Sequence, residues 1–288
     1  MNKPRQTQDP APSLIQADRS ATTSVAREQG RRGGGEKEDG GIPIVRVRDL
    51  WMEYPGRTGS DRTAVLQNIS FDVFEGEFVC IVGPSGCGKT TLLNIIAGFL
   101  SGSRGEVLVE GCPVSGPDRQ RIFIFQEGGV FPWLTVSQNI AFGLDALSVA
   151  ERDNVIRRSV DLVGLTGFEN AWPRALSGGM KQRVEIARAL AASPRLLYMD
   201  EPFGALDYLT RMKIRSDLST ICAAEKTTVL FVTHDIDEAL QLADRVLVMS
   251  HRPATVQSTV EVPLPRPRDL SSRGYLQTRQ QIFDAMEQ

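Results

Sequence analysis

The stretch FVCIVGPSGCGKTTLL, residues 78–93, contains the most informative pattern of this 288-residue chain. It begins with five apolar residues, 78–82, which are typical of a buried strand in a parallel sheet. In the next eight residues, 83–90, two glycines bracket four residues and are followed by Lys and Thr. The apolar spacing of residues 91–97 is that of a helix. A strand, a glycine-rich loop and a helix in this order predict a phosphate-binding loop.

The residue types of this loop suit a nucleoside triphosphate. Glycines let the backbone curl so that N–H groups point at phosphate oxygens, and the helix presents its positive end to the same anion. Lys89 is expected to reach the β- and γ-phosphates, and Thr90 to offer its hydroxyl to Mg²⁺. A chance match arises in roughly 1% of chains of this length, and the flanking strand and helix argue against one here. The residues predicted to bind the nucleotide are Gly83, Pro84, Ser85, Gly86, Cys87, Gly88, Lys89, Thr90 and Thr91.

The four cysteines do not indicate a reactive thiol, a zinc site or a disulfide scaffold. Cys87 lies in the loop, where a helix N-terminus favours a reactive thiolate, but a small side chain also simply fits there, and we favour the second interpretation. Cys80, Cys112 and Cys222 form no CxxC pair and have no adjacent histidine, which argues against a zinc site and a disulfide scaffold. This usage fits a reducing cytoplasm.

A second apolar run, residues 196–199, ends in two acids, Asp200 and Glu201. Burial of the run places Asp200 at the carboxyl edge of the sheet, where a carboxylate can hold Mg²⁺ directly or through water. Glu201 can then point at the water that attacks the γ-phosphate and act as its general base. Two acids after a strand are more often a solvated turn, but the phosphate loop earlier in the chain favours the catalytic interpretation.

Further apolar runs extend the pattern and predict an α/β fold with a parallel sheet. The other expected strands lie at residues 44–47, 69–73, 107–109, 122–125, 228–232, 246–249 and 255–256. Helices separated by Gly and Pro predict a helical insertion at about 127–192. The main domain is expected over residues 42–262, followed by a C-terminal extension, 263–288, with a Pro/Arg-rich start and a short helix.

Residues 1–41 are rich in Gly, Ser, Thr, Gln and charge, and predict a disordered tail, with a basic membrane-surface contact as the alternative. The whole chain has the balance of a soluble globular protein, with 41% hydrophobic and 24% charged residues. A net charge of −2 gives no sign of a nucleic-acid partner. No apolar run approaches the ~20 residues that cross a bilayer, so a membrane role would fall to another chain.

The stretch LSGGMKQR, residues 176–183, precedes a predicted helix at 184–192. Ser177 is a good N-cap, and Gly178 and Gly179 expose backbone N–H groups, which together make a second anion site. Here the chain resembles the ATP-binding-cassette (ABC) family, whose signature reads Leu-Ser-Gly-Gly-Gln, with Met180 in place of the glutamine. The resemblance covers about residues 44–260 and implies a phosphate-loop NTPase core, a small antiparallel β subdomain that holds adenine, and an inserted α-helical subdomain.

The resemblance also implies roles for residues outside the loop. Gln126 matches the glutamine that links Mg²⁺ and the attacking water to the helical subdomain, and Asp207 matches a loop that crosses the dimer interface. His234, which taken alone would be read as structural, matches the histidine that contacts the γ-phosphate. Tyr54 resembles the aromatic residue that stacks on adenine, with Trp51 as the competitor.

In this family the signature of one protomer closes over the nucleotide of the other, which implies a homodimer that buries two ATP molecules with Mg²⁺. The aromatic stretch 130–136 could be core, or a groove for a helix of a membrane-spanning permease, and the resemblance favours the groove. Stretches 130–136, 176–183, 233–239 and 262–269 are similar to the nitrate, sulfonate, taurine and bicarbonate importer group. That group implies an ATPase at the cytoplasmic face of the inner membrane, peripheral through its permease, and an extracytoplasmic solute-binding protein.

Two other classes remain to be weighed. A soluble ABC ATPase that acts on nucleic acid or ribosomes usually carries a coiled coil, zinc ligands or two cassettes, and the sequence shows none of these. A phosphate-loop kinase or GTPase would lack the signature at Ser177–Gly179 and the histidine at position 234. An importer ATPase is therefore the expected function, although the sequence does not name the solute.

Overall fold

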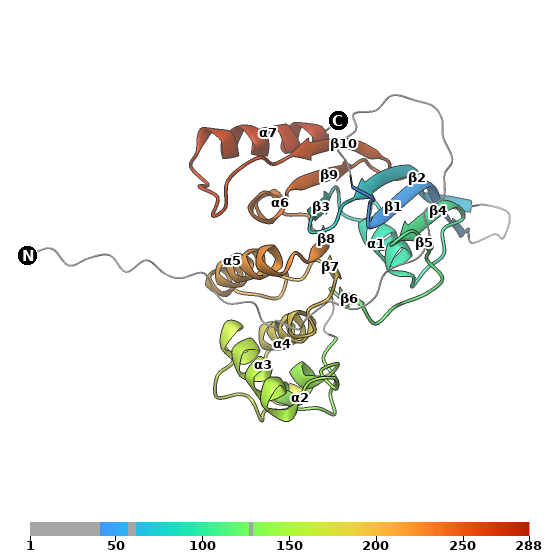
Figure 1. Ribbon diagram of the computed structural model, residues 1–288. Coiled ribbons are helices and arrows are strands. Elements are labelled where there is room, and N and C mark those ends of the chain that lie inside the picture. The colour runs from blue at the N-terminus through green and yellow to red at the C-terminus, as the bar shows by residue number, and fades with distance from the viewer. Residues whose placement is uncertain (1–40, 57–61, 127–128, 288) are drawn as a thin grey trace, which may run out of the picture.

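The computed structural model describes residues 41–56, 62–126 and 129–287, so the predicted tail lies almost wholly outside the described residues (Figure 1). Its centre is a six-stranded sheet in the order β10-β9-β3-β8-β7-β6, parallel except for β10. Short apolar runs form its middle strands because both faces of these strands are covered. The strands are β3 (Phe78–Val82), β6 (Arg121–Ile124), β7 (Leu196–Asp200), β8 (Thr228–Val232), β9 (Arg245–Met249) and β10 (Val256–Glu261).

A second, antiparallel sheet has the order β2-β1-β4-β5. Helix α1 (Lys89–Ala97), one face of this sheet and one face of the central sheet share a single apolar core. The phosphate-loop segment therefore leads into a helix enclosed by apolar side chains. The four strands are β1 (Val45–Pro55), β2 (Arg62–Val73), β4 (Arg104–Val109) and β5 (Cys112–Pro113).

Helices cover the rest of the molecule. The first group has its own apolar core, and its last helix packs against β6 at one edge of the central sheet, at the bottom of Figure 1. This group consists of α2 (Val136–Ala141), α3 (Val149–Leu162), the short 3-10 helix η1 (Pro173–Ala175) and α4 (Gly178–Ala191). The second group is α5 (Tyr208–Glu225), α6 (Ile236–Leu242) and α7 (Arg273–Glu287), and α7 packs on β9 and β10 at the opposite edge. None of the helices described is long and apolar enough to cross a membrane.

The α/β fold with a parallel and an antiparallel sheet is confirmed, with differences in detail. The helix after the signature starts at Gly178, six residues before the predicted start, because the Ser177 hydroxyl accepts a hydrogen bond from the Met180 N–H at 3.2 Å and caps it there. Strand β1 continues to Pro55 and so includes both Trp51 and Tyr54. Helices α5 and α6 and strand β5 were not predicted.

Candidate functional site

The phosphate-loop residues lie between the end of β3 and the start of α1. Gly86 and Gly88 have φ of 73° and 124°, which L side chains rarely adopt. Methyl groups on Gly83 and Gly88 would come within 2.9 Å of the Met249 carbonyl oxygen and of a Val65 methyl. The loop is thus packed between the end of β9 and strand β2, and its glycines are required by space as well as by conformation.

Lys89 lies under this loop with 6% of its surface exposed. Its ammonium donates hydrogen bonds to the carbonyl oxygens of Gly83 at 2.8 Å and of Pro84 at 3.0 Å. An ammonium has three N–H donors, so one remains for a phosphate oxygen. Lys89 can therefore hold the curl of the loop and an anion in it at the same time.

Cys87 is buried in the loop, and this burial raises the pKa of its thiol. A position for a methyl group on Gly83 lies 3.3 Å from the Cys87 sulfur, so the space around the thiol is tight. Both observations favour the interpretation that a small side chain fits here, since a raised pKa lowers the fraction of reactive thiolate. The exposed free cysteine is Cys112, on the antiparallel sheet.

Asp200 ends β7 with 3% of its surface exposed, and the Thr90 hydroxyl hydrogen-bonds to its carboxylate. Burial raises the pKa of Asp200, and the Glu201 charge adds to this. Its Oδ1 has no hydrogen-bond partner among the described residues. A buried carboxylate oxygen without a partner, beside a hydroxyl, suits a hard cation such as Mg²⁺. No group of three or more His, Cys, Asp or Glu side chains in the described ranges could hold a metal alone, so the remaining ligands would be phosphate and water.

Three side chains from separate strand ends converge next to Asp200. The Nδ1 of His234 lies 3.1 Å from Glu201 Oε2, and the amide Nε2 of Gln126 lies 3.5 Å from the same oxygen. Glu201 has a φ of 46°, uncommon for a residue with a side chain, and its N–H is held by the Val232 carbonyl at 2.9 Å. Backbone strain from a positive φ is frequent at functional sites, where it fixes the direction of a side chain. The arrangement offers one carboxylate with two polar partners at the edge of the sheet, as a general base requires.

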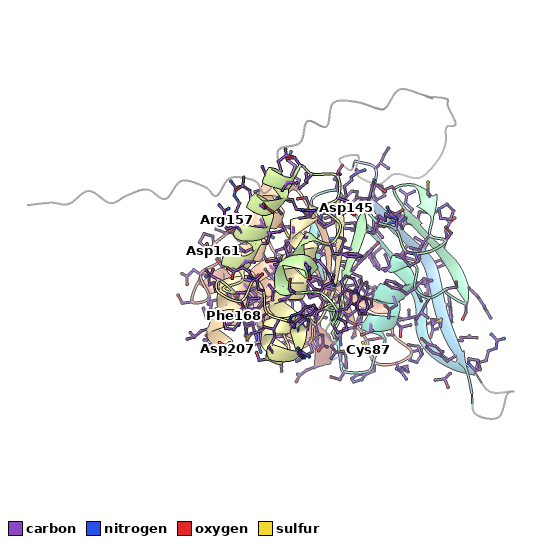
Figure 2. All side chains as sticks on the ribbon, turned by 90° about the horizontal axis from the view of Figure 1, so that it is seen from below. Cys87, Asp145, Arg157, Asp161, Phe168 and Asp207 are labelled. Carbon is purple, nitrogen blue, oxygen red and sulfur yellow. The ribbon has the colours of Figure 1, made fainter. Side chains whose placement is uncertain are left out.

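The signature residues and Asp207 lie together, away from the phosphate loop. A methyl group on Gly179 would come within 2.9 Å of the Ala205 carbonyl oxygen, so the start of α4 packs on the loop before Asp207. Asp207 caps α5 by accepting a hydrogen bond from the Thr210 N–H at 3.1 Å. In the described part of the chain no hydrogen bond or ion pair joins these residues to the phosphate loop, and Figure 2 shows Asp207 apart from Cys87.

The two signature glycines differ in their surroundings, which gives a matched pair of substitutions. We expect Gly179→Ala to lower the free energy of unfolding by about 1–3 kcal/mol, because the Ala205 carbonyl leaves no room for the methyl group. Gly178→Ala has nothing within 4 Å and should leave stability unchanged or raise it by up to about 1 kcal/mol, since Ala favours a helix. Urea unfolding of both variants measures this, and equal stabilities would contradict the close packing.

Tyr54 and Trp51 both lie on β1, but their surroundings differ. Tyr54 pairs with Thr63, two residues from the Val65 side chain that adjoins Gly88 of the phosphate loop, and its ring is 38% exposed. The Trp51 ring is covered by the Arg104 guanidinium, 5.9 Å from its centre. The exposed ring near the loop is therefore the better surface for adenine.

Two residues near the site carried no signal in the sequence. Arg252, beyond β9, donates a hydrogen bond of 2.6 Å to the carbonyl oxygen of Gly86. Glu185 of α4 accepts hydrogen bonds from the backbone N–H of Phe125 at 3.1 Å and of Gly129 at 2.8 Å, on either side of Gln126. Burial raises the pKa of Glu185, while these bonds favour its ionised form. Both contacts join segments far apart in the sequence, which no local pattern reveals.

Comparison with known proteins gives the family. Residues 66–204 match the ABC transporter family model. The chain is 43% identical over 243 residues to the aliphatic sulfonates import ATP-binding protein SsuB of Bacillus cereus, covering 84% of this chain and 96% of that protein. It is 46% identical to an ABC transporter ATP-binding protein of Methanocaldococcus jannaschii, covering 79% and 86%.

Among solved structures, the dimeric ATP-binding cassette MJ0796 bound to ADP and Pi matches with a TM-score of 0.68 and 33% identity, over 76% of this chain and 99% of that one. A second dimeric structure of this cassette matches with a TM-score of 0.69. The fold, the phosphate loop and these relatives agree. The chain belongs to the ABC transporter family and is an ABC-type ATPase.

Proposed function

We propose that this chain is the ATPase subunit of an importer, in which two copies hydrolyse ATP to drive uptake of a small solute through a separate permease. The observation that carries the catalytic part is the convergence of Gln126, Glu201 and His234 beside Asp200 and the phosphate loop. The similarity to aliphatic sulfonates import proteins supports the importer part.

In the proposed reaction, the phosphate loop and Lys89 would hold the triphosphate, and Thr90, Asp200 and Gln126 would hold Mg²⁺. Mg²⁺ when bound supplies charge that neutralises the phosphate oxygens. Glu201 takes the proton of the attacking water at its carboxylate. His234 keeps Nδ1 on Glu201, which leaves its Nε2 for a γ-phosphate oxygen.

The site requires a second copy of this chain. Ser177, Gly178 and Gly179 adjoin the loop before Asp207 rather than the phosphate loop of their own chain, and they present the positive end of α4 to solvent. In a symmetric pair these residues would close over the triphosphate held by the partner, with Asp207 at the interface. Tyr208 and Leu209, which follow Asp207, are 67% and 75% exposed, and such apolar exposure supports an interface at this loop. The dimeric state of MJ0796 supports the pairing of two copies.

An aromatic patch beside Gln126 is the proposed permease-docking surface. Its members are Phe131, Trp133 and Phe142, whose rings lie 4.5–5.6 Å apart around Phe131. Trp133 is 68% exposed and Phe142 58%. The Arg188 guanidinium lies 4.6 Å from the Phe131 ring and holds the patch against α4. A permease helix bound here would place the chain on the cytoplasmic face of the membrane, and the net charge of −2 does not favour the nucleic-acid alternative.

A substitution in the docking surface should remove permease binding without changing ATP hydrolysis. We expect Trp133→Asp to abolish co-purification of the permease, because a carboxylate would be buried against an apolar helix, while the ATPase rate of the isolated chain stays within about twofold. Leu276→Asp, on the exposed face of α7, is the matched control and should retain the permease.

The measurement is affinity purification of the tagged chain from native membranes in mild detergent. Recovery with a multi-spanning protein in a one-to-one ratio supports the importer, and the binding protein that accompanies it leads to the solute, which we expect to be nitrate, a sulfonate, taurine or a similar small solute. Recovery with ribosomes or nucleic acid would contradict the importer and leave the ATPase standing.

A further inference from the structure

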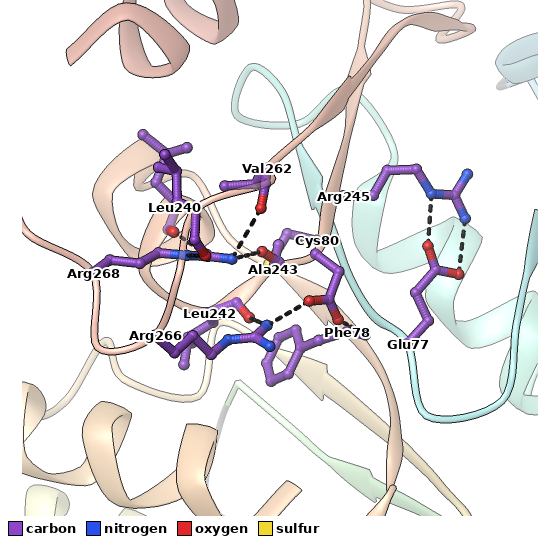
Figure 3. Close-up of polar contacts among 12 residues, drawn as sticks. Glu77, Phe78, Cys80, Leu240, Leu242, Ala243, Arg245, Val262, Arg266 and Arg268 are labelled. Carbon is purple, nitrogen blue, oxygen red and sulfur yellow. Dashed lines mark hydrogen bonds and ion pairs between the residues drawn. The ribbon is translucent and has the colours of Figure 1, made fainter. Parts of the chain in front are cut away.

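The C-terminal extension holds both ends of α6 (Ile236–Leu242), the helix that begins two residues after His234. Figure 3 shows the contacts at its C-terminal end. The extension runs along α6, and α7, which belongs to the extension, packs against α6. None of its residues contacts the phosphate loop through a hydrogen bond or ion pair in the ranges described. Helix α6 offers one route from the extension to the reaction centre, because it begins two residues after His234.

Arg268 holds the C-terminal end of α6. Its guanidinium donates hydrogen bonds to the carbonyl oxygens of Leu240 and, at 2.5 Å, of Ala243. The last carbonyls of a helix lack intrahelical partners, and a cation there also matches the negative end of the helix dipole. Burial and the charge of Arg266 lower the pKa of Arg268 to about 10, so Arg268 is still a cation at neutral pH.

Arg266 reinforces this contact. It donates a hydrogen bond of 2.5 Å to the carbonyl oxygen of Leu242 and forms an ion pair of 2.9 Å with Asp244. Two arginines of the extension therefore occupy four acceptors around the end of the helix, which are three backbone carbonyls and the Asp244 carboxylate.

Asp237, in the first turn of α6, is held by α7. The Tyr275 hydroxyl donates to Asp237 Oδ1 at 2.9 Å, and the Arg279 Nε donates to the same oxygen at 3.0 Å. Tyr275 is fully buried, so its ring and hydroxyl have a fixed place. The helix is thus fixed to the extension at its first turn as well as at its last.

A continuous set of hydrogen bonds connects α6 with the backbone on both sides of His234. The Thr233 hydroxyl donates to Glu238 of α6 at 2.7 Å and accepts from the Asp235 N–H at 3.0 Å. The His234 ring itself is exposed over 62% of its side chain, and its one polar contact among the described residues is Glu201. The place of the ring therefore depends on its backbone, which is held by α6 together with the hydrogen bond from the Thr233 N–H to the Ile81 carbonyl of β3.

We propose that Arg268 is a positioning residue for ATP hydrolysis, which acts through α6 to hold His234 at its contact with Glu201. The proposal rests on the proposed role of His234 at the reaction centre. It assigns the C-terminal extension a part in turnover that neither nucleotide binding nor permease docking requires.

The test compares Arg268→Met with the wild-type full-length chain. We expect kcat to fall about tenfold with KM for ATP unchanged, since a misplaced catalytic group can cost up to about 100-fold. The chain has two histidines, so histidine labelled with ¹³C at Cε1 alone gives two ring resonances. The His234 resonance, identified by its loss in His234→Ala, should move in Arg268→Met, while that of His251 should stay in place.

Two further variants separate positioning from stability. Arg245→Met is the matched control, because Arg245 is also largely buried and ion-paired, at 2.8 Å with Glu77, but lies outside α6 (Figure 3). We expect it to lower stability and leave kcat within twofold. Tyr275→Phe removes only the hydroxyl bond to Asp237, keeps the buried ring, and should lower kcat about threefold, which tests the proposal even where Arg268→Met fails to fold.

The decisive comparison is Arg268→Met in a His234→Ala background, where it should have no further effect on kcat. The same loss in both backgrounds, an unmoved His234 resonance, or an equal loss in Arg245→Met would overturn the proposal. If His234→Ala lowers kcat and folded Arg268→Met does not, the positioning role of Arg268 is contradicted and the proposed role of His234 stands. If His234→Ala leaves kcat unchanged, the proposed role of His234 falls as well.

Discussion

Replacement of Glu201 by Gln is expected to reduce ATP turnover by about 10²–10⁴-fold, the contribution typical of a general base. The amide has nearly the shape of the carboxylate and can still accept the hydrogen bond from His234, but it cannot take a proton from water. Nucleotide binding should remain, because the phosphate loop and Lys89 are untouched. We therefore expect the variant to accumulate as an ATP-bound dimer.

The measurement combines an assay of released phosphate with size-exclusion chromatography and light scattering, with and without ATP and Mg²⁺. The expected species with ATP has twice the mass of one chain. Glu261→Gln, at an exposed acid on β10 that is far from the site in sheet order, is the matched control and should behave as wild type. Normal hydrolysis by Glu201→Gln would assign the base to another residue.

Lys89→Ala has the second largest expected effect. The substitution removes a buried cation that holds two carbonyls of the loop and can reach the phosphates. A hydrogen bond to a charged group is worth about 1.5–3 kcal/mol, so the loss of the one contact that Lys89 has left for a phosphate oxygen predicts that the Kd for ATP rises about 10- to 150-fold. Turnover should fall with it.

Titration with a fluorescent ATP analogue measures this affinity. Lys213→Ala, at an exposed lysine of α5, removes the same charge from the chain and should leave Kd unchanged. If the Kd for the Lys89→Ala variant stays within threefold of wild type, the loop does not hold the triphosphate in the way proposed.

The parts of the fold that could be predicted from sequence are those with a strong local pattern. Strands β3, β7 and β8 are uninterrupted apolar runs, because both faces of a central parallel strand are buried. Residues directly after such runs lie at one edge of the sheet, which is why Glu201 could be expected near the phosphate loop. The role of His234 was expected only from the resemblance to the ABC family.

Where the pattern was weak, the sequence predicted less. Gly178 and Gly179 are poor helix formers, so the predicted helix started too late. Helix α5 was missed because its buried face consists of Ile214, Arg215, Leu218 and Cys222, and a buried arginine breaks the apolar pattern. Glu185, Arg252 and Arg268 bond to backbone groups of residues that are far away in the sequence. Every residue has such backbone groups, so the sequence does not reveal which of them these side chains contact.

Glu185 has a mechanical consequence. Its carboxylate pins the loop around Gln126 to the side of α4, a helix of 14 residues and therefore about 21 Å long. Both hydrogen bonds hold the same loop to Glu185, and a helix of this length moves as a rigid body. Arg188 joins the aromatic patch to the same helix. A displacement of the patch is therefore expected to move Ser177 and Gln126 together.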